Sequence, residues 1–512
     1  MKRRVVLMNP PTAAPSGEVL LNLAYLSSVL KDAGHEVLVL DATAPHEPLS
    51  EKEIKEKILD FKPDFIGVTL TITYIPQTYE YLMRLRPLEI PIVAGGPHAN
   101  CCPEEVLSNG ADIVVIGEGE MTIIELMEYF DGKKKLKNIA GLCYKKKDGS
   151  FHRTKNRPLI ENLDSLPFPD YSEFPIKKYT GSDDPSSNPI FWSIFSSRGC
   201  PYNCIFCSSH NVFGRTFRTR SPKNVFKEIE SLVKTYGASI FAFQDDEAFI
   251  DKKRIIEFCD LVKKSKLELK FSARLRIDNF DEELLKELKS IGFRRLSFGT
   301  ESFNDDTLKK INKMYNVEKM RKGINLLDKV QSLAVSFTNM IGFPWETPEH
   351  LHKSLEETRK FPKSLIYFNC TVTPVPYPNT VLYEKYHKEY SFTDWWLDPK
   401  RNHPPLKSEI SHAFFMLFLS VQPQEPLYTE SQFWTYSPEM KKAMVEFCWK
   451  TSSLYLKKCL GPIEYKFAFK FSRVSHKIWK WSPLLERILF YPFKCLVKIL
   501  QLDKKAMFKY RL

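Results

Sequence analysis

The 512-residue sequence lacks any apolar run long enough to cross a membrane. The longest, from about Ala413 to Val421, has about half of the ~20 residues that a spanning helix needs. The N-terminus passes from basic residues directly into a strand-like run, without the apolar core and cleavage site of a secretory signal. The eleven cysteines lack the regular spacing of a disulfide framework. These absences predict a cytoplasmic protein, and the length predicts two or three domains.

The net charge of +13 is concentrated in one segment. From Lys457 to Leu512 there are 14 Lys and Arg against 3 acidic residues, so the rest of the chain is nearly neutral. Aromatic residues interleave with these basic ones, and the run from Leu484 to Leu502 is largely apolar. Such a tail is typical of contact with anionic lipid, so we predict peripheral membrane binding. Packing of the rings on the preceding domain is the alternative, and nucleic acid is a less favoured partner.

The first part of the chain alternates β-branched apolar runs with helical patterns. This alternation predicts an α/β fold with a parallel, doubly wound, Rossmann-like sheet. Ligands bind such sheets beyond the carboxyl ends of the strands, so the loops at those ends are candidate binding loops. The five expected strands are Val5–Asn9, Glu36–Asp41, Phe65–Leu70, Pro91–Gly95 and Asp112–Ile116.

A hairpin and a Pro- and Asp-rich linker follow, and then a second strand-helix series begins. Its six strand-like runs predict a partial (β/α)6 barrel, open on one side. After Tyr390 the alternation stops, and a mostly helical, aromatic and basic tail is expected. The predicted division of the chain is therefore 1–135 for the first domain, 136–187 for the linker, 188–390 for the barrel and 391–512 for the tail.

The segment SSRGCPYNCIFCSS places Cys200, Cys204 and Cys207 directly after the first barrel strand, in a C-x3-C-x2-C arrangement. Three thiolates this close on one loop can hold a single iron-sulfur cluster while leaving one iron without a protein ligand. That open iron invites a chelator such as the amino and carboxylate groups of S-adenosylmethionine (SAM). A structural zinc site is the alternative, with His210 as a fourth ligand, but zinc prefers two spaced pairs and no second pair lies nearby.

This motif in its strand-loop-helix setting resembles the radical SAM superfamily, and the resemblance implies a 4Fe-4S cluster on the three cysteines. It also implies that SAM lies against the ends of successive barrel strands, where the chain reads FQDDEAF, SARLRID, FGTES and IGFPWET. A helix N-terminal cap is the alternative role for one of the two aspartates of FQDDEAF. The SAM-binding candidates are Phe206, Gln244, Asp245, Asp246, Arg274, Glu301, Ile341 and Gly342.

A five-unit parallel sheet ahead of such a barrel resembles the cobalamin-binding subfamily, the class B methyltransferase-like radical SAM enzymes. The sequence D-x-H-x-x-G, by which some cobalamin proteins supply a histidine to cobalt, is absent; the nearest match, at 32–35, has the wrong spacing. We therefore predict cobalamin with no histidine on cobalt, and His98 as a hydrogen-bonding loop residue. The cobalamin-binding candidates are Asn9, Pro10, Thr69, Gly95, Gly96, His98, Gly117, Glu118 and Gly119.

An N-terminal domain with a second cluster, as in the methylthiotransferases, is less favoured, because Cys101, Cys102 and Cys143 have no cluster-like spacing. The resemblance implies reductive cleavage of SAM to a 5′-deoxyadenosyl radical, with electrons from an external donor such as ferredoxin or flavodoxin. With cobalamin, it implies methylation of an unactivated carbon of a small, hydrophobic substrate. Oxidative cyclisation or rearrangement of such a substrate is the alternative. A non-catalytic electron carrier is disfavoured, because carriers normally ligate all four irons.

Overall fold

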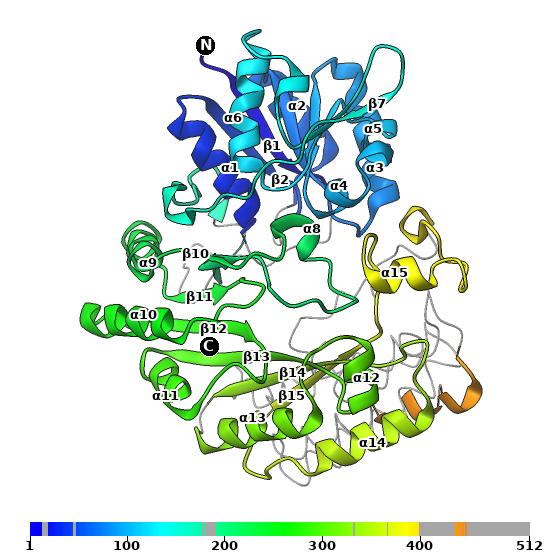
Figure 1. The fold of residues 1–512 in the computed structure, drawn as a ribbon. Helices are drawn as coiled ribbons and strands as arrows, with labels where there is room; N and C mark the ends of the chain where they lie inside the picture. The colour runs from blue at the N-terminus through cyan, green and yellow to red at the C-terminus, as the bar shows by residue number, and fades with distance from the viewer. Residues whose placement is uncertain are drawn as a thin grey trace, which may run out of the picture.

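The computed structural model describes residues 1–12, 19–44, 48–176, 179, 191–330, 333–365, 367–398, 436–440, 442–444 and 446–447. Two α/β domains follow one another along the chain, and Figure 1 shows the first above the second. None of the helices in these ranges combines the length and the apolar character needed to span a bilayer. The basic tail from Lys457 to Leu512, with the membrane contact predicted for it, lies outside the described residues.

The first domain contains the predicted parallel sheet. Its strand order is β2-β1-β3-β4-β5-β6-β7, so the order reverses between β1 and β3, where sheets of this kind bind ligands. The parallel strands are buried and apolar, as expected when helices cover both faces. They are β1 (Arg4–Asn9), β2 (Glu36–Asp41), β3 (Phe65–Thr69), β4 (Ile92–Gly95) and β5 (Ile113–Val115).

The helices of this domain begin and end at recognisable signals. For example, Ser50 and Glu53 form a reciprocal capping box at the start of α2, and Lys62 ends that helix in the left-handed conformation. The helices are α1 (Leu21–Asp32), α2 (Glu51–Phe61), α3 (Ile75–Leu85), α4 (Pro97–Cys101), α5 (Pro103–Ser108) and α6 (Gly119–Phe130).

The sheet extends further along the chain than the sequence indicated. The hairpin assigned to the linker forms β6 (Leu142–Lys145) and β7 (Phe151–Arg153), and β6 pairs antiparallel with β5. Strand pairing therefore continues the first domain past residue 135. The sequence pattern could not show this, because a hairpin has the same local signals whether it pairs with a sheet or stands alone.

The second domain contains the predicted partial barrel, a six-stranded parallel sheet in the order β15-β14-β13-β12-β11-β8. Its strands are β8 (Trp192–Ile194), β11 (Ile240–Phe243), β12 (Lys270–Leu275), β13 (Phe293–Glu301), β14 (Ala334–Met340) and β15 (Tyr367–Val372). Its main helices are α9 (Pro222–Tyr236), α10 (Lys252–Ser265), α11 (Glu282–Ser290), α12 (Asp305–Lys310), α13 (Val317–Lys329) and α14 (Pro348–Arg359).

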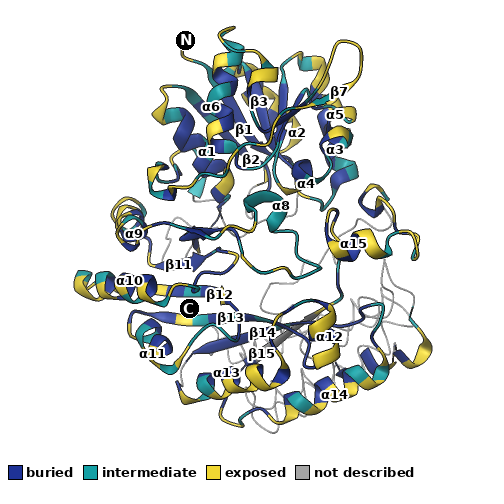
Figure 2. Cartoon of the chain, viewed as in Figure 1, coloured by how far each residue is buried: buried dark blue, intermediate teal, exposed yellow. Residues whose placement is uncertain are grey.

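Short elements lie between the two domains. A two-stranded ladder joins β9 (Ser197–Arg198) to β10 (Arg218–Thr219), and α8 (His210–Phe213) and α15 (Val381–Tyr386) flank the junction (Figure 1). The single-turn helix η4 (Trp395–Leu397) follows α15. Figure 2 shows that the strands of both sheets are buried, whereas the outer faces of the barrel helices are exposed.

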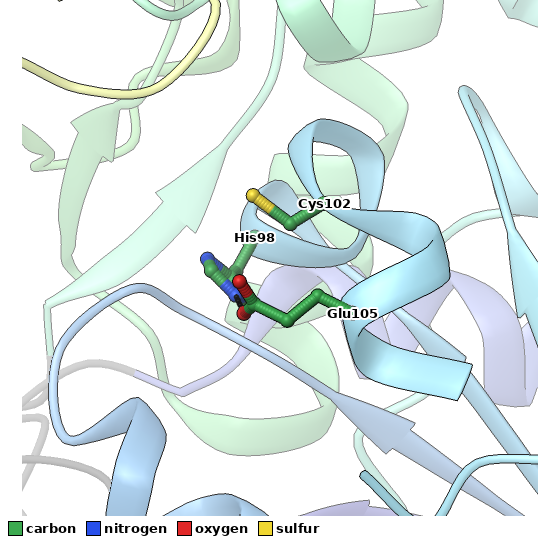
Figure 3. A group of neighbouring side chains, drawn as sticks. All are labelled: His98, Cys102 and Glu105. Carbon is green, nitrogen blue, oxygen red and sulfur yellow. Dashed lines mark hydrogen bonds and ion pairs between the residues drawn. The ribbon is translucent and has the colours of Figure 1, made fainter. Parts of the chain in front are cut away.

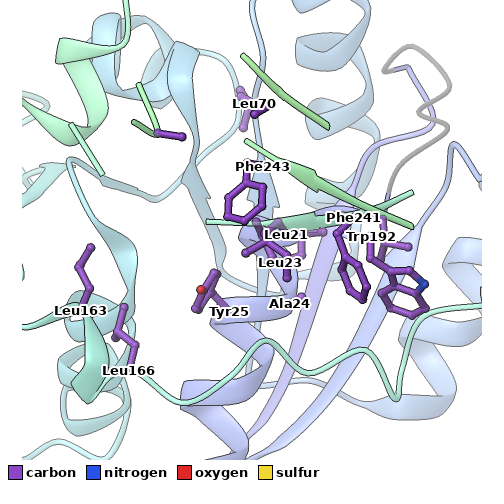
Figure 4. Close-up of a cluster of buried hydrophobic side chains, with 14 of the residues drawn as sticks. Leu21, Leu23, Ala24, Tyr25, Leu70, Leu163, Leu166, Trp192, Phe241 and Phe243 are labelled. Carbon is purple, nitrogen blue, oxygen red and sulfur yellow. The ribbon is translucent and has the colours of Figure 1, made fainter. Parts of the chain in front are cut away.

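One hydrophobic core runs through both domains. Stacked phenylalanines fill the space between the barrel sheet and its helices; the ring centroids of Phe271 and Phe293, for example, are 5.2 Å apart. Figure 4 shows side chains of α1, such as Tyr25, in the same cluster as Trp192 and Phe243 of the barrel. A core shared in this way fixes the orientation of the two domains, because neither can rotate without exposing apolar surface.

Candidate functional site

The three cysteines lie on the loop that follows β9, at the side of the barrel that faces the first domain (Figure 1). The loop begins at Gly199, whose φ is +83° and where a Cβ atom would lie 2.4 Å from the carbonyl oxygen of Thr216. Only glycine fits there. Cys200, Cys204 and Cys207 are free and half-buried. All three thiols are therefore available on one short loop.

Hydrogen bonds hold this cysteine loop against the rest of the barrel. The amide of Ile205 donates to the carbonyl oxygen of Ile311 at 3.1 Å, and Asn312 donates to the carbonyl of Asn203 at 2.9 Å. On the other side, the amide of Leu382 donates to the carbonyl of Ile205 at 3.0 Å. The loop is thus fixed between the turn after α12 and the start of α15.

Buried cations lie beside the loop. Lys313 pairs with Glu301 at 2.8 Å, both side chains being 8% exposed, and its ammonium group is 6.0 Å from the ring of Phe206. The guanidinium of Arg276 lies 3.7 Å from the ring centroid of Tyr202, which is a residue of the cysteine loop. Burial raises the pKa of Cys204, and these two cations oppose the rise. They give the loop the positive surroundings that thiolates require.

The three cysteine sulfurs are not gathered into a compact single-ion site. Thiolates on one zinc ion lie about 2.3 Å from the metal, and so roughly 4 Å from one another. In the described ranges, the only three His, Cys, Asp or Glu side chains whose ligand atoms lie within 4.8 Å of one another belong to a different group. At least one pair of the cysteine sulfurs is therefore more than 4.8 Å apart, so the loop is not arranged around one zinc ion.

The residues at the end of β11 divide into different environments. Asp245 is buried and accepts hydrogen bonds from the amide and hydroxyl of Ser196, at 3.0 and 2.9 Å, and from the hydroxyl of Ser197. It holds the connection between β8 and β9 in place and has no free acceptor toward a ligand. Asp246 is exposed beside Ser209, and Gln244 is half-buried. Of the two aspartates, Asp246 remains open to a ligand.

At the end of β13, Glu301 lies beside the cysteine loop through its pair with Lys313. It is not a glycine, yet its φ is +62°, an uncommon backbone conformation that is concentrated at functional sites. Arg274 is exposed on β12, opposite Ser297 of β13. Beside Asn279, the buried Glu247 has a pKa raised to about 7 by burial. Glu247 was not among the residues expected at the site, although it directly follows Asp245 and Asp246 in the loop after β11.

The segment IGFPWET forms an internal turn. The carboxylate of Glu346 accepts hydrogen bonds from the amides of Gly342 and Phe343, at 2.7 and 3.1 Å, and burial raises its pKa to about 7. The carbonyl of Gly342 accepts from Tyr436 at 2.7 Å. The side chain of Ile341 packs in an apolar cluster with Met444 and other residues after the barrel. The structure therefore uses Ile341 and Gly342 in packing and internal hydrogen bonds.

In the first domain, the candidate residues lie on loops at one edge of the sheet. Asn9 donates to Asp41 at 3.0 Å and to Thr43 at 2.7 Å, so its amide is engaged, and Pro10 beside it is buried. Thr69 accepts from Asn22 at 3.0 Å. These contacts tie the end of β1 to the end of β2, and the end of β3 to α1, at the point where the strand order reverses.

The glycines at this edge have different surroundings. A Cβ atom at Gly96, where φ is +95°, would lie 2.8 Å from the carbonyl oxygen of Leu70, so this residue must be glycine for packing alone. Gly119 begins α6, and a Cβ there would lie 3.3 Å from Leu26. Apart from the adjoining residues of the chain, no atom of the described part of the protein lies within 4 Å of a Cβ built on Gly95 or Gly117. These two positions leave space that a ligand could occupy.

His98 is buried and hydrogen-bonded within the protein, as the sequence analysis expected. Its Nε2 atom lies 2.9 Å from the hydroxyl of Tyr79 and 3.1 Å from a carboxylate oxygen of Glu105. The same carboxylate accepts from the indole of Trp396, at 3.0 Å, so this group spans the two domains.

A buried ion-pair network joins the two sets of loops. Arg198 pairs with Glu118 at 2.9 Å and with Glu120 at 2.5 Å, and Arg218 pairs with Glu118 at 2.8 Å. All four side chains are at most 8% exposed. Glu118, a cobalamin-binding candidate, is thus committed to the contact between domains. Arg198 stands two residues before Cys200, so the network links the glycine loop of the first domain directly to the cysteine loop.

Sequence reasoning missed two of these functional residues for different reasons. Arg198 belongs to the segment that drew attention to the cysteines, so its position was visible although its partners were not. Lys313 had no signal, because nothing about a lone lysine in a helix-turn segment indicates that it is buried beside a cluster loop.

The fold and the site define a protein in which a three-cysteine loop of a partial barrel faces a Rossmann-like domain, the arrangement expected of a radical SAM enzyme with an added cofactor domain. Family models agree with this assignment. The B12 binding domain matches residues 18–127, and the radical SAM superfamily matches residues 194–358.

Known proteins resemble the chain over most of its length. An uncharacterized methyltransferase of Pyrococcus horikoshii is 33% identical over 393 residues, which cover 74% of this chain and 82% of that protein. The anaerobic magnesium-protoporphyrin IX monomethyl ester cyclase of Rubrivivax gelatinosus is 32% identical over 70% of this chain and 65% of its own length. Among solved structures, the radical SAM methyltransferase TsrM of Kitasatospora setae, with cobalamin and a [4Fe-4S] cluster bound, has a TM-score of 0.62 and 21% identity, over 76% of this chain and 79% of that one.

The chain belongs to the radical SAM superfamily, in the group of enzymes that carry an N-terminal B12-binding domain. Its cofactors are accordingly a 4Fe-4S cluster, SAM and cobalamin. This confirms the family, the two-domain architecture and the cofactors that the sequence predicted.

Proposed function

We propose that this enzyme methylates an unactivated carbon of a small-molecule substrate, with cobalamin as the carrier of the methyl group. The observation that carries the proposal is the buried network of Arg198 with Glu118 and Glu120. It ties the loop proposed to approach the corrin to the loop proposed to hold the cluster. A methyl carrier and a radical generator must act on the same substrate atom, so they must be presented to one space.

In this proposal the cluster and SAM supply a 5′-deoxyadenosyl radical, and cobalamin supplies the methyl group. Cys200, Cys204 and Cys207 hold the cluster. Lys313 and Arg276 offset the negative charge of the thiolates. Asp246 and Glu301 present carboxylates toward SAM, with Phe206, Gln244 and Arg274 around them. An external donor such as ferredoxin or flavodoxin supplies the electrons.

The residues proposed to hold cobalamin in the first domain are those at the carboxyl edge of its sheet. Gly95 and Gly117 leave room for the corrin or its nucleotide tail, and the loops of Asn9-Pro10 and Thr69 border the same edge. His98 is engaged with Tyr79 and Glu105, which supports cobalamin bound without a histidine on cobalt.

The test uses the anaerobically reconstituted enzyme with cobalamin, a reductant and SAM that carries a deuterated methyl group. We expect 5′-deoxyadenosine and a corrinoid with the deuterated methyl group, both measured by mass spectrometry, and neither measurement requires the substrate. 5′-Deoxyadenosine without any labelled corrinoid would favour the second candidate, oxidative cyclisation, which the similarity to the cyclase of Rubrivivax gelatinosus supports. Absence of 5′-deoxyadenosine would contradict both.

Gly95→Val tests the proposed cobalamin site. The Cβ atom meets no protein atom within 4 Å, so we expect an unchanged melting temperature of the cobalamin-free protein. If the corrin approaches this position, the added bulk costs about 1–3 kcal/mol and weakens cobalamin binding by roughly 5- to 150-fold. Equilibrium dialysis measures the affinity. Gly96→Ala is the contrasting variant, because its Cβ would collide with the protein and lower the melting temperature itself. Unchanged affinity in Gly95→Val would remove this loop from the site.

We also propose that the tail from Lys457 to Leu512 binds anionic membrane surfaces, which would suit a hydrophobic substrate. Each basic residue near an anionic surface contributes roughly 1 kcal/mol, and salt weakens the attraction. We expect the full-length protein to sediment with phosphatidylserine-containing liposomes at low salt and to be released at high salt. The variant truncated after Leu456 should stay in the supernatant. Equal sedimentation of the two proteins would contradict the proposal.

A further inference from the structure

A second group of potential metal ligands lies outside the cysteine loop. His98 is in α4, Cys102 connects α4 to α5, and Glu105 is in α5. One ligand atom from each lies within 4.8 Å of the other two. Figure 3 shows the three side chains pointing toward one another from successive turns of this helical segment. The spacing, His-x3-Cys-x2-Glu, brings them to one face because helical residues three and four apart are neighbours.

The charge of this group is not balanced by the protein. Glu105 accepts hydrogen bonds from Tyr79 at 2.5 Å and from Trp396 at 3.0 Å. Within the described part of the chain, its only ion-pair partner is His98, and no lysine or arginine contacts it. A carboxylate that is only 20% exposed thus depends on one imidazole for its counter-charge. Such a carboxylate is costly to bury unless a cation accompanies it.

The imidazole cannot supply that charge without a penalty. His98 is 2% exposed, and its Nδ1 atom has no hydrogen-bond partner among the described residues. A protonated ring would bury an unpaired N–H group, whereas a neutral ring would leave Glu105 without a cation. A buried donor left unpaired costs about 1–3 kcal/mol. A divalent cation bound between these side chains supplies the missing counter-charge, and when it binds Nδ1 it also gives that atom a partner and leaves Nε2–H to donate to Glu105.

We propose that His98, Cys102 and Glu105 bind one zinc ion at a site separate from the cysteine loop. A neutral imidazole, a thiolate and a carboxylate are ligands that zinc takes, and the thiolate disfavours magnesium and calcium. Binding releases the thiol proton of Cys102 to solvent. The two positive charges of the ion then balance one thiolate and one carboxylate, so the buried site is neutral.

Two further residues support the arrangement. Trp396 donates to both carboxylate oxygens of Glu105, at 3.3 Å to Oε1 and 3.0 Å to Oε2, and so holds the carboxylate with Oε1 3.1 Å from Nε2 of His98. The ring of Trp396 also packs edge-on against His98, with centroids 6.1 Å apart. Because Trp396 follows the barrel and His98 belongs to the first domain, a zinc ion here would stabilise the contact between the two domains. Its role would be structural.

The test adds zinc chloride to the reconstituted, cobalamin-loaded enzyme, removes unbound metal by desalting and measures zinc and iron by mass spectrometry. We expect one zinc per chain in addition to the cluster iron. Zinc X-ray absorption, which iron and cobalt do not obscure, should show one sulfur at about 2.3 Å and nitrogen or oxygen ligands at about 2.0–2.2 Å. Cys102→Ser should remove the sulfur signal and weaken zinc binding by more than roughly tenfold. Removing only a hydrogen bond to a metal ligand typically weakens metal binding by about 10- to 100-fold, and the loss of a ligand itself should cost at least as much.

Cys101→Ser is the matched control, because this neighbouring cysteine contacts Asn211 and does not belong to the group. It should keep both the zinc and the single sulfur, and every variant should keep its cluster iron, which shows that it is folded. Three outcomes would overturn the proposal. These are no zinc retained by the folded wild-type enzyme, zinc surrounded by three or four sulfurs, and the single-sulfur zinc signal retained in Cys102→Ser.

Discussion

Alanine at any one of Cys200, Cys204 and Cys207 is expected to abolish both the cluster and the cleavage of SAM. Each thiolate holds a separate iron, and a three-cysteine site has no spare protein ligand to replace a lost one. The reconstituted wild-type enzyme should contain about four irons per chain. Each variant should lose the cluster absorption, and its 5′-deoxyadenosine formation should fall to the level of a protein-free control.

The matched control is Cys259→Ala. Cys259 is fully buried in α10, among the barrel core residues, so its replacement tests the loss of a cysteine without the loss of a cluster ligand. This variant should retain the iron and the SAM cleavage of the wild type. If the three loop variants kept full iron content and activity, the cluster would have to be held elsewhere in the chain.

Removal of the Arg198 guanidinium, which bridges the two domains, is expected to have the second largest effect, a loss of folding stability. Arg198→Met leaves Glu120 buried without its cation, while Glu118 keeps Arg218. Breaking a buried ion pair by removing one partner costs about 3–5 kcal/mol, because the remaining charge is uncompensated. We therefore expect a markedly lower melting temperature. Arg198→Met combined with Glu120→Gln should recover part of the loss, because the double variant buries no unpaired carboxylate.

The ion pairs of Arg198 with Glu118 and Glu120 also predict a change in the distances between the two cofactors, which a general loss of stability would not produce. Cob(II)alamin and the reduced cluster are both paramagnetic, so pulsed electron paramagnetic resonance measures the distribution of distances between them. Arg198→Met should broaden that distribution, because the cysteine loop loses its contact with Glu118 and Glu120. Glu228→Gln is the control, since Glu228 and Arg220 are equally buried and both belong to the barrel domain, and the substitution leaves in place the 3.4 Å contact of Arg220 with Tyr25 of the first domain. It should lower the melting temperature and leave the distribution narrow; equal broadening in both variants would reject a positioning role for Arg198.

The position of Arg198 explains why the network matters for the proposed reaction. The residue is only two positions from Cys200, so a displacement of its guanidinium moves the start of the cysteine loop. The partners belong to the segment Gly117-Glu118-Gly119-Glu120, which borders the edge of the first domain where cobalamin is proposed to bind. Beside the shared core, this buried contact is thus proposed to help set how the cluster and the corrin face one another, and small misplacements of reacting groups are costly for catalysis.

The sequence by itself determined the parts of this protein that depend on short-range order. The three cysteines span eight positions directly after a predicted strand, so their spacing and that local setting together predict the cluster. Strands and helices alternate with periods that are visible locally, and both α/β domains were predicted for that reason. The absence of D-x-H-x-x-G is likewise a local fact, and the engagement of His98 agrees with the prediction drawn from it.

Only the tertiary structure decided which charged residues act together. Glu118 was expected to contact cobalamin, but it pairs with Arg198, 80 positions later, and no local pattern links the two. The same holds for Lys313 with Glu301 and for Trp396 with Glu105. Whether a charged side chain is exposed or buried depends on how two domains pack, and the energy of a charge depends on that burial. Pairing across domains is therefore settled by the assembled core that the two domains share.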